Sequence, residues 1–275
     1  MLILGIDTSG RQGSVALLRA DEDEQLVTLE LVPISGGQYS ELLVPSIAGL
    51  LARHGFERRS IDLIGVASGP GSFTGLRIAI ATTKGLAEAF ATPVVAVSVL
   101  EAIALASATG SAALPLASAT GSAALPLASA TGSAALPDAP ASATGALSAR
   151  PVLAALDAQR SELFFGEYMV NASSQEPAHM MREGIASFGD FTSIIAACDP
   201  PAPIFTPDDG LATRLHEVAL DAHLLTRPTA EFYARIAHRK FLAGVRADVA
   251  TLDANYLRRS DAEIFSPPKP SSASR

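Results

Sequence analysis

Apolar and polar residues alternate in short runs at the start of the chain and then change to a helical spacing. The first apolar runs, at 2–6, 14–18 and 26–32, are separated by turn residues, which predicts an antiparallel meander of three strands. The elements predicted after the meander are a helix at 38–53, a strand at 63–67, a helix at 74–90 and a strand at 94–97.

The same pattern restarts after residue 150. A strand at 152–156 ends on Asp157, as the first strand ends on Asp7, and a second strand follows at 163–170. Further helices are predicted at 188–198, 208–216 and 228–245. Because the two halves open alike, the sequence predicts an α/β protein with the duplicated actin-like (ASKHA, ribonuclease-H-like) fold, in which two domains have mixed sheets flanked by helices.

Between the halves, three copies of LASATGSAALP fill residues 105–137, and a decayed fourth copy follows. Each copy contains Thr-Gly and ends in Pro, which interrupts a helix, and its Ala, Ser and Gly offer little apolar area to offset backbone ordering. We therefore interpret this stretch as a disordered insertion and not as a functional module. The predicted organisation is an N-terminal domain at 1–104, the insertion at 105–149, a C-terminal domain at 150–265 and a disordered tail at 266–275.

The composition of the chain argues against several classes of function. The net charge is −8 and no Lys/Arg-rich stretch stands out, so the chain lacks the basic surface that binding to a phosphate backbone usually needs. Cys198 is the only cysteine, which excludes an intramolecular disulfide and a thiolate metal cluster. The chain has neither a long apolar run nor a signal-like opening, and these two features predict a cytoplasmic protein without a membrane span.

Two segments carry candidate chemistry. Asp7 ends a buried strand and is followed by a polar turn, so its carboxylate would lie at a sheet edge where α/β proteins form clefts, although aspartate also favours turns. The segment 69–77, GPGSFTGLR, lies between a strand and a helix and could present free N–H groups to an anion, or simply connect the two tightly. It is neither a Walker loop nor a GxGxxG fingerprint. The candidate nucleotide-binding residues are Asp7, Thr8, Ser9, Gly69, Gly71, Ser72, Gly75 and Arg77.

Metal and nucleophile motifs are missing from the sequence. The five histidines are scattered, and His216-Glu217 lacks the second histidine at the spacing of a zincin site. No G-x-S-x-G elbow occurs. The sequence therefore predicts no catalytic residues and no metal site.

Three segments resemble the TsaB family, also called YeaZ. They are the opening ILGIDTS, the block SGPGSFTGLRIAIATTKGLA at 68–87 and LDAQRSELFFGEY at 156–168, and the closing YLRRSDAE at 256–263 fits as well. The likeness covers most of the chain outside the insertion and the tail. One departure lies at the start of the first helix, where the family commonly has His-Ser-Glu and this chain has Tyr39-Ser40-Glu41.

The resemblance implies a non-catalytic subunit in the formation of threonylcarbamoyladenosine at position 37 of tRNAs that read ANN codons. Its expected partners are the transferase TsaD, in a heterodimer, and the ATPase TsaE, with tRNA reached only through the complex and a homodimer possible in isolation. No intrinsic cofactor is expected, although ATP or ADP could bind at the interface with partners. The helices at 38–53 and 74–90 would form the face that docks TsaD. The residues expected there are Leu43, Ile47, Leu50, Ile78, Ala81, Thr82, Gly85 and Leu86.

The sequence leaves two other classes of function open. An active actin-like ATPase or sugar kinase would use Asp7, Asp157 and the glycine loop, but residues 150–265 contain no second glycine-rich phosphate loop. A glycoprotease-type metallopeptidase would need ligand histidines, which the helix at 38–53 does not supply.

Overall fold

The computed structural model describes residues 1–21, 24–108, 149–171, 178–196 and 202–257. The predicted insertion beyond residue 108, Cys198 and the tail at 266–275 lie outside these residues.

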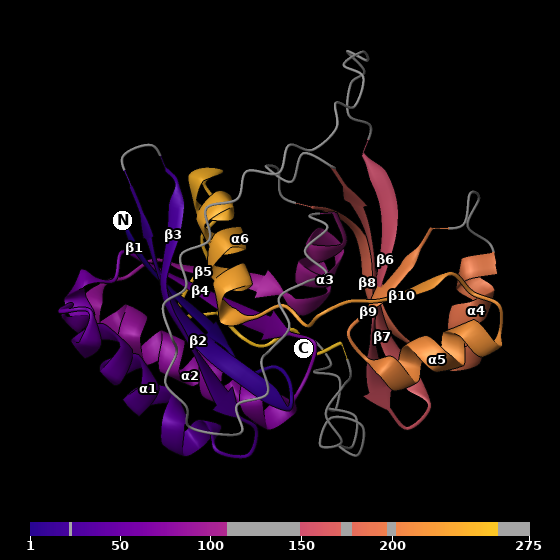
Figure 1. The fold of residues 1–275 in the computed structure, drawn as a ribbon, viewed down its shortest axis with the longest axis horizontal. Coiled ribbons are helices and arrows are strands. Elements are labelled where there is room, and N and C mark those ends of the chain that lie inside the picture. The colour runs from indigo at the N-terminus through magenta and orange to yellow at the C-terminus, as the bar shows by residue number, and fades with distance from the viewer. Residues whose placement is uncertain (22–23, 109–148, 172–177, 197–201, 258–275) are drawn as a thin grey trace, which may run out of the picture.

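The chain folds into two lobes, each built on a mixed five-stranded sheet (Figure 1). The first sheet has the order β3-β2-β1-β4-β5, with β1 antiparallel to β2 and parallel to β4. Its strands are β1 (Leu2–Asp7), β2 (Gln12–Ala20), β3 (Leu26–Ser35), β4 (Leu63–Gly69) and β5 (Val94–Ser98). The predicted meander and both later strands of this half are confirmed.

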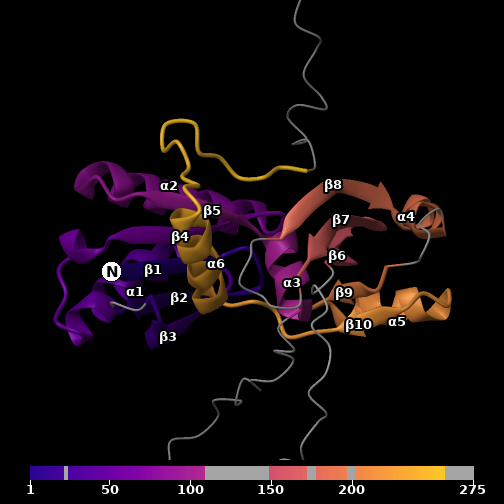
Figure 2. The ribbon, with the colours of Figure 1, turned by 90° about the horizontal axis from the view of Figure 1, so that it is seen from above.

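Helices cover both faces of the first sheet. The helices α1 (Tyr39–Arg53) and α2 (Phe73–Phe90) lie side by side on one face, and a short turn, η1 (Arg58–Ser60), follows α1. The other face is covered by α6 (Ala230–Leu242), a helix that comes from the far end of the chain and packs on β4, β1 and β2 (Figure 2). Alternate residues of β1 therefore enter two separate apolar cores.

The second sheet has the order β10-β9-β6-β7-β8. Its strands are β6 (Arg150–Gln159), β7 (Glu162–Val170), β8 (His179–Ser187), β9 (Ile204–Thr206) and β10 (Ala222–Leu224). The helices α4 (Phe188–Ala196) and α5 (Asp209–Glu217) pack on one face. On the other face lies α3 (Val99–Ala108), which joins the two lobes in one apolar core (Figure 1).

The structure corrects the start of the predicted insertion. Residues 105–108 belong to α3, and the Leu105 side chain is only 2% exposed although it opens the first repeat. Apart from Glu101, the residues of α3 that precede Leu105 are buried and apolar, and Leu105 continues this buried face into the first repeat. The prediction for the remaining repeats concerns residues that the structure does not describe.

The chain also returns to the first lobe after the second sheet. Beyond α6, the Ala247 N–H donates to the Val94 carbonyl at 2.8 Å and the Asn255 N–H to the Ser68 carbonyl at 2.7 Å. The prediction of a C-terminal domain at 150–265 did not include this return to the first lobe. None of the helices described combines the length and apolar character that a bilayer-spanning helix requires.

Candidate functional site

The turn after β1 and the loop between β4 and α2 lie directly against each other. The Thr8 hydroxyl donates to the Gly75 carbonyl at 2.7 Å, and the Ser72 N–H donates to the Ser9 carbonyl at 2.8 Å. Ser72 also caps α2, since its Oγ accepts from the Gly75 N–H at 3.3 Å. The structure thus brings together two segments that sequence reasoning assigned to one candidate site.

Two glycines make this close approach possible. A Cβ on Gly71 would lie 2.3 Å from the Ser9 carbonyl oxygen, and one on Gly75 would lie 2.0 Å from the Thr8 carbonyl oxygen. Both positions therefore admit only a hydrogen atom beside the chain's own backbone. The glycine loop therefore packs directly on the turn after β1, and a phosphate does not fit between these two segments.

The predicted residues Gly69 and Arg77 lie apart from this contact. Gly69 has a φ of 111° and sits beside the Asn255 backbone, where a Cβ would be 3.1 Å from the Asn255 carbonyl oxygen. The Arg77 guanidinium lies 4.0 Å above the Phe73 ring centroid, and its Nε donates to the Tyr256 hydroxyl at 3.1 Å. Arg77 is thus engaged in an exposed aromatic cluster.

Asp7 is deeply buried at the end of β1. Its Oδ1 accepts from the Ser9 N–H at 2.9 Å and from the Ser9 hydroxyl at 2.6 Å. Burial raises the pKa of Asp7, while the positive charge of Arg227 and the hydrogen bonds from Ser9 act in the opposite direction. Among the described residues, Ser9 and Arg227 therefore stabilise this carboxylate.

Tyr39 has a structural role in the same region. Its side chain is 4% exposed, and its hydroxyl donates to the Gly10 carbonyl at 2.8 Å. Burial, together with the negative charge of Asp7, raises the pKa of Tyr39 to about 12. The departure from histidine at this position thus places a neutral hydrogen-bond donor against the turn after β1.

In the second lobe, Asp157 is exposed near the end of β6. Its N–H donates to Asp208 Oδ2 at 2.8 Å, and its own Oδ1 accepts from the Gln159 N–H at 2.8 Å. Among the residues that are described, no group of three or more His, Cys, Asp or Glu side chains is placed to hold a metal ion.

The predicted docking residues divide between core and surface. Leu43, Ile47 and Leu50 are each at most 3% exposed and pack in the core beneath α1, so the structure corrects their assignment to an exposed face. On α2, by contrast, Ala81 and Gly85 are exposed, while Ile78, Thr82 and Leu86 are half-buried. Sequence reasoning missed two apolar residues on the outside of α1, Leu42 (38% exposed) and Val44 (55%).

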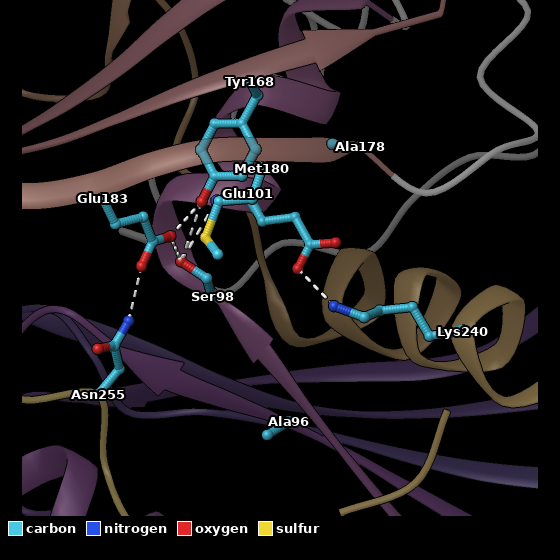
Figure 3. A pocket seen from close by; sticks show the side chains of 9 residues that line it. All are labelled: Ala96, Ser98, Glu101, Tyr168, Ala178, Met180, Glu183, Lys240 and Asn255. Carbon is cyan, nitrogen blue, oxygen red and sulfur yellow. Dashed lines mark hydrogen bonds and ion pairs between the residues drawn. The ribbon is translucent and has the colours of Figure 1, made fainter. Parts of the chain in front are cut away.

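A cavity of about 460 Å³ lies between the lobes and contains a network of polar side chains, and no sequence motif pointed to it (Figure 3). The Glu183 carboxylate accepts hydrogen bonds from the hydroxyls of Ser98 and Tyr168 and from the Asn255 amide. Across the cavity, Lys240 pairs with Glu101 at 2.7 Å. These residues come from both lobes and the returning C-terminal segment, so the polar network fixes the lobes relative to each other.

Comparison with known proteins places these features in a family context. Residues 33–125 match the family model TsaD, tRNA N6-adenosine threonylcarbamoyltransferase. The chain is 38% identical over 104 residues to the tRNA threonylcarbamoyladenosine biosynthesis protein TsaB of Bacillus subtilis, which is 38% of this chain and 44% of that protein. It is also 36% identical over 121 residues to the tRNA N6-adenosine threonylcarbamoyltransferase of Methylorubrum extorquens, covering 38% of this chain and 35% of the relative.

The matched stretch therefore spans less than half the length of these curated relatives. In three dimensions the likeness extends further. The solved structure of YeaZ from Pseudomonas aeruginosa superposes with a TM-score of 0.62 and 22% sequence identity, covering 92% of this chain and all of that one. This agreement confirms the predicted duplicated actin-like fold.

Proposed function

We propose that the chain is a member of the TsaB (YeaZ) family and that it acts in tRNA threonylcarbamoyladenosine biosynthesis as a non-catalytic subunit that binds a TsaD-type transferase. A TsaE-type ATPase joins this pair, and tRNA is reached only through the complex. ATP or ADP, where the assembly uses it, binds at the interface between partners.

The observation that carries this proposal is the outer surface of α1 and α2. We name it the α1–α2 face, and it consists of Leu42, Val44, Ile78, Ala81, Thr82, Gly85 and Leu86. The two helices lie side by side on one face of the first sheet (Figure 1), and these side chains are exposed or half-buried.

The composition of the α1–α2 face suits a helical partner. Ala81 and Gly85 are small, so a facing helix can approach closely along α2. A Cβ on Gly85 would meet no atom within 4 Å, which leaves this position free of contacts within the chain. Leu42 and Val44, which lie about 200° apart around α1, add exposed apolar area on its two flanks.

Charges introduced on the α1–α2 face test the proposal. We expect Val44→Glu, Thr82→Glu and Gly85→Arg each to weaken capture of the TsaD-type partner at least tenfold, because each places a charge in a contact that excludes water. The matched control is Leu224→Glu on β10, since Leu224 is 54% exposed and Val44 is 55% exposed. The Val44→Glu and Leu224→Glu variants should both keep the wild-type melting temperature.

The measurements are pull-down or calorimetry with the partner, together with thermal melting of each variant alone. Unchanged binding by all three variants of the α1–α2 face would contradict the proposed docking surface. For the non-catalytic role, the purified chain alone should neither hydrolyse ATP at a catalytic rate nor modify tRNA, and robust modification by the single component would contradict that part.

A further inference from the structure

The turn after β1 is enclosed from a second side by a residue far away in the sequence. Arg227 lies on the segment that crosses from the second lobe to α6. Its Nη2 donates to the Ser9 hydroxyl at 3.3 Å, and that hydroxyl donates to Asp7 Oδ1 at 2.6 Å. A short relay therefore connects the guanidinium of Arg227 to the buried carboxylate of Asp7.

Gly10 makes room for this guanidinium. A Cβ at position 10 would lie 2.8 Å from Arg227 Nε and 3.0 Å from Arg227 Cζ, so the planar group rests directly on the backbone of the turn. The opposite side of the same turn is closed by Gly71 and Gly75, as described above. The backbone of residues 8–10 thus lies between the glycine loop and Arg227.

The crossing segment is fixed on both sides of Arg227. Before it, the Leu225 N–H donates to the Thr206 carbonyl at 3.0 Å in the second lobe. After it, the Ala230 N–H donates to the buried Ser14 hydroxyl at 2.9 Å in the first lobe. These two bonds hold the arginine over the turn, so its position follows from how the chain crosses between the lobes.

We propose that Arg227 is the built-in occupant of the position that Asp7 and Ser9 would otherwise offer to a metal cation. A buried carboxylate needs a compensating charge, which either a bound metal ion or a cationic side chain can supply. In this chain the guanidinium supplies it. The cation position of this subunit is therefore filled by its own chain, whether or not the α1–α2 face docks a transferase.

Other groups around Asp7 agree with this assignment. Among the described residues, the Ser9 hydroxyl accepts from Arg227 Nη2, whereas the buried Arg227 Nε has no hydrogen-bond partner. The positive charge of Arg227 also lowers the pKa values of Tyr39 and Tyr233, against the larger effect of burial. All three acidic groups around the turn thus sense the same cation.

A double-mutant cycle in the full chain tests the proposal. Arg227→Met removes the charge and keeps the length of the side chain, and we expect the melting midpoint to fall by roughly 5–15 °C because Asp7 is left as a buried unpaired charge. Adding Asp7→Asn should restore part of that loss. The control pair is Arg246→Met with Asp7→Asn, since Arg246 is exposed and stacks on Phe241. There the two effects should simply add.

Additive losses in the Arg227 and Asp7 pair would overturn the proposal. A second measurement keeps it testable if a variant fails to fold: calorimetric titration of the wild-type chain with Mg²⁺ and ADP. We expect no binding that depends on Asp7. Saturable binding that disappears in Asp7→Asn would also overturn the proposal, because a Mg²⁺ ion and the guanidinium cannot occupy one position.

Discussion

The carbonyl oxygen of Thr8 lies only 2.0 Å from the position that a Cβ of Gly75 would take. This relationship joins the first strand of the chain to the start of α2 through a contact between backbones. It explains the GPGSFTGLR segment without any ligand, because its glycines at 71 and 75 are the residues that let the loop close on the turn after β1.

Gly75→Ala should therefore destabilise the protein. Alanine gains about 1 kcal/mol over glycine in a helix, but its Cβ would displace the Thr8 backbone, and such overpacking costs about 1–3 kcal/mol or more. Gly85→Ala in the same helix is the control, because its Cβ would meet nothing within 4 Å and should stabilise the protein slightly. Chemical unfolding of both variants measures the difference, and equal free energies of unfolding would contradict it.

Glu183→Ala should weaken the connection between the lobes. It leaves the donors of Ser98, Tyr168 and Asn255 without their acceptor, which costs about 1–3 kcal/mol when such groups are buried. Glu167→Ala is the matched control, since its partner Arg182 is 45% exposed and surface ion pairs contribute about 0–1 kcal/mol. Hydrogen exchange should increase in α3 and β8 for the first variant only, and equal exchange in both would contradict this role.

Leu105→Ala should cost about 2–5 kcal/mol of unfolding free energy, because it empties a buried position in the core shared by both lobes. Two deletions refine the test. Replacing residues 105–149 by a short linker should destabilise the protein, whereas replacing residues 109–148 should leave the free energy of unfolding within about 1–2 kcal/mol of wild type, a small part of a typical domain's stability. Equal stability of the two deletions would show that Leu105 contributes nothing.

His238 should make stability depend on pH. Burial lowers the pKa of His238, so the folded state keeps the ring neutral while the unfolded chain takes up a proton below its usual pKa of 6.5. The free energy of unfolding should therefore fall as pH drops below about 6.5, until the lowered pKa is reached. His238→Gln should flatten this dependence between pH 7.5 and 5.5, and His223→Gln, an exposed control, should leave it unchanged.

Hydrophobic spacing predicted the elements of the first lobe closely. Predicted helices at 38–53 and 74–90 appear as Tyr39–Arg53 and Phe73–Phe90, because one apolar face of each packs on the sheet and a capping residue marks the start of α2. Spacing did not reveal which apolar residues stay exposed. Leu43 and Val44 are neighbours in sequence, yet the first is 1% and the second 55% exposed, which depends on how α1 is rotated over the sheet.

The other features that the sequence did not predict depend on long-range contacts. The strand β8 has little apolar alternation, because it forms an edge of the second sheet and its Met180 and Met181 are more than half exposed. Arg227 carried no local signal, since its role depends on Ser9 and Gly10, which lie more than two hundred residues earlier in the chain. The cavity network around Glu183 likewise assembles from four separate segments.

The return of α6 to the first sheet has a consequence for synthesis on the ribosome. The face of β1, β2 and β4 that α6 covers is translated long before residues 230–242 leave the exit tunnel. During that interval the nascent first lobe lacks the helix that covers Ile3, Ala16 and Leu63. Such transiently open apolar surface is what chaperones bind, and contacts of this sequence separation slow folding. The lobe that begins first is thus among the last parts of the chain to be completed.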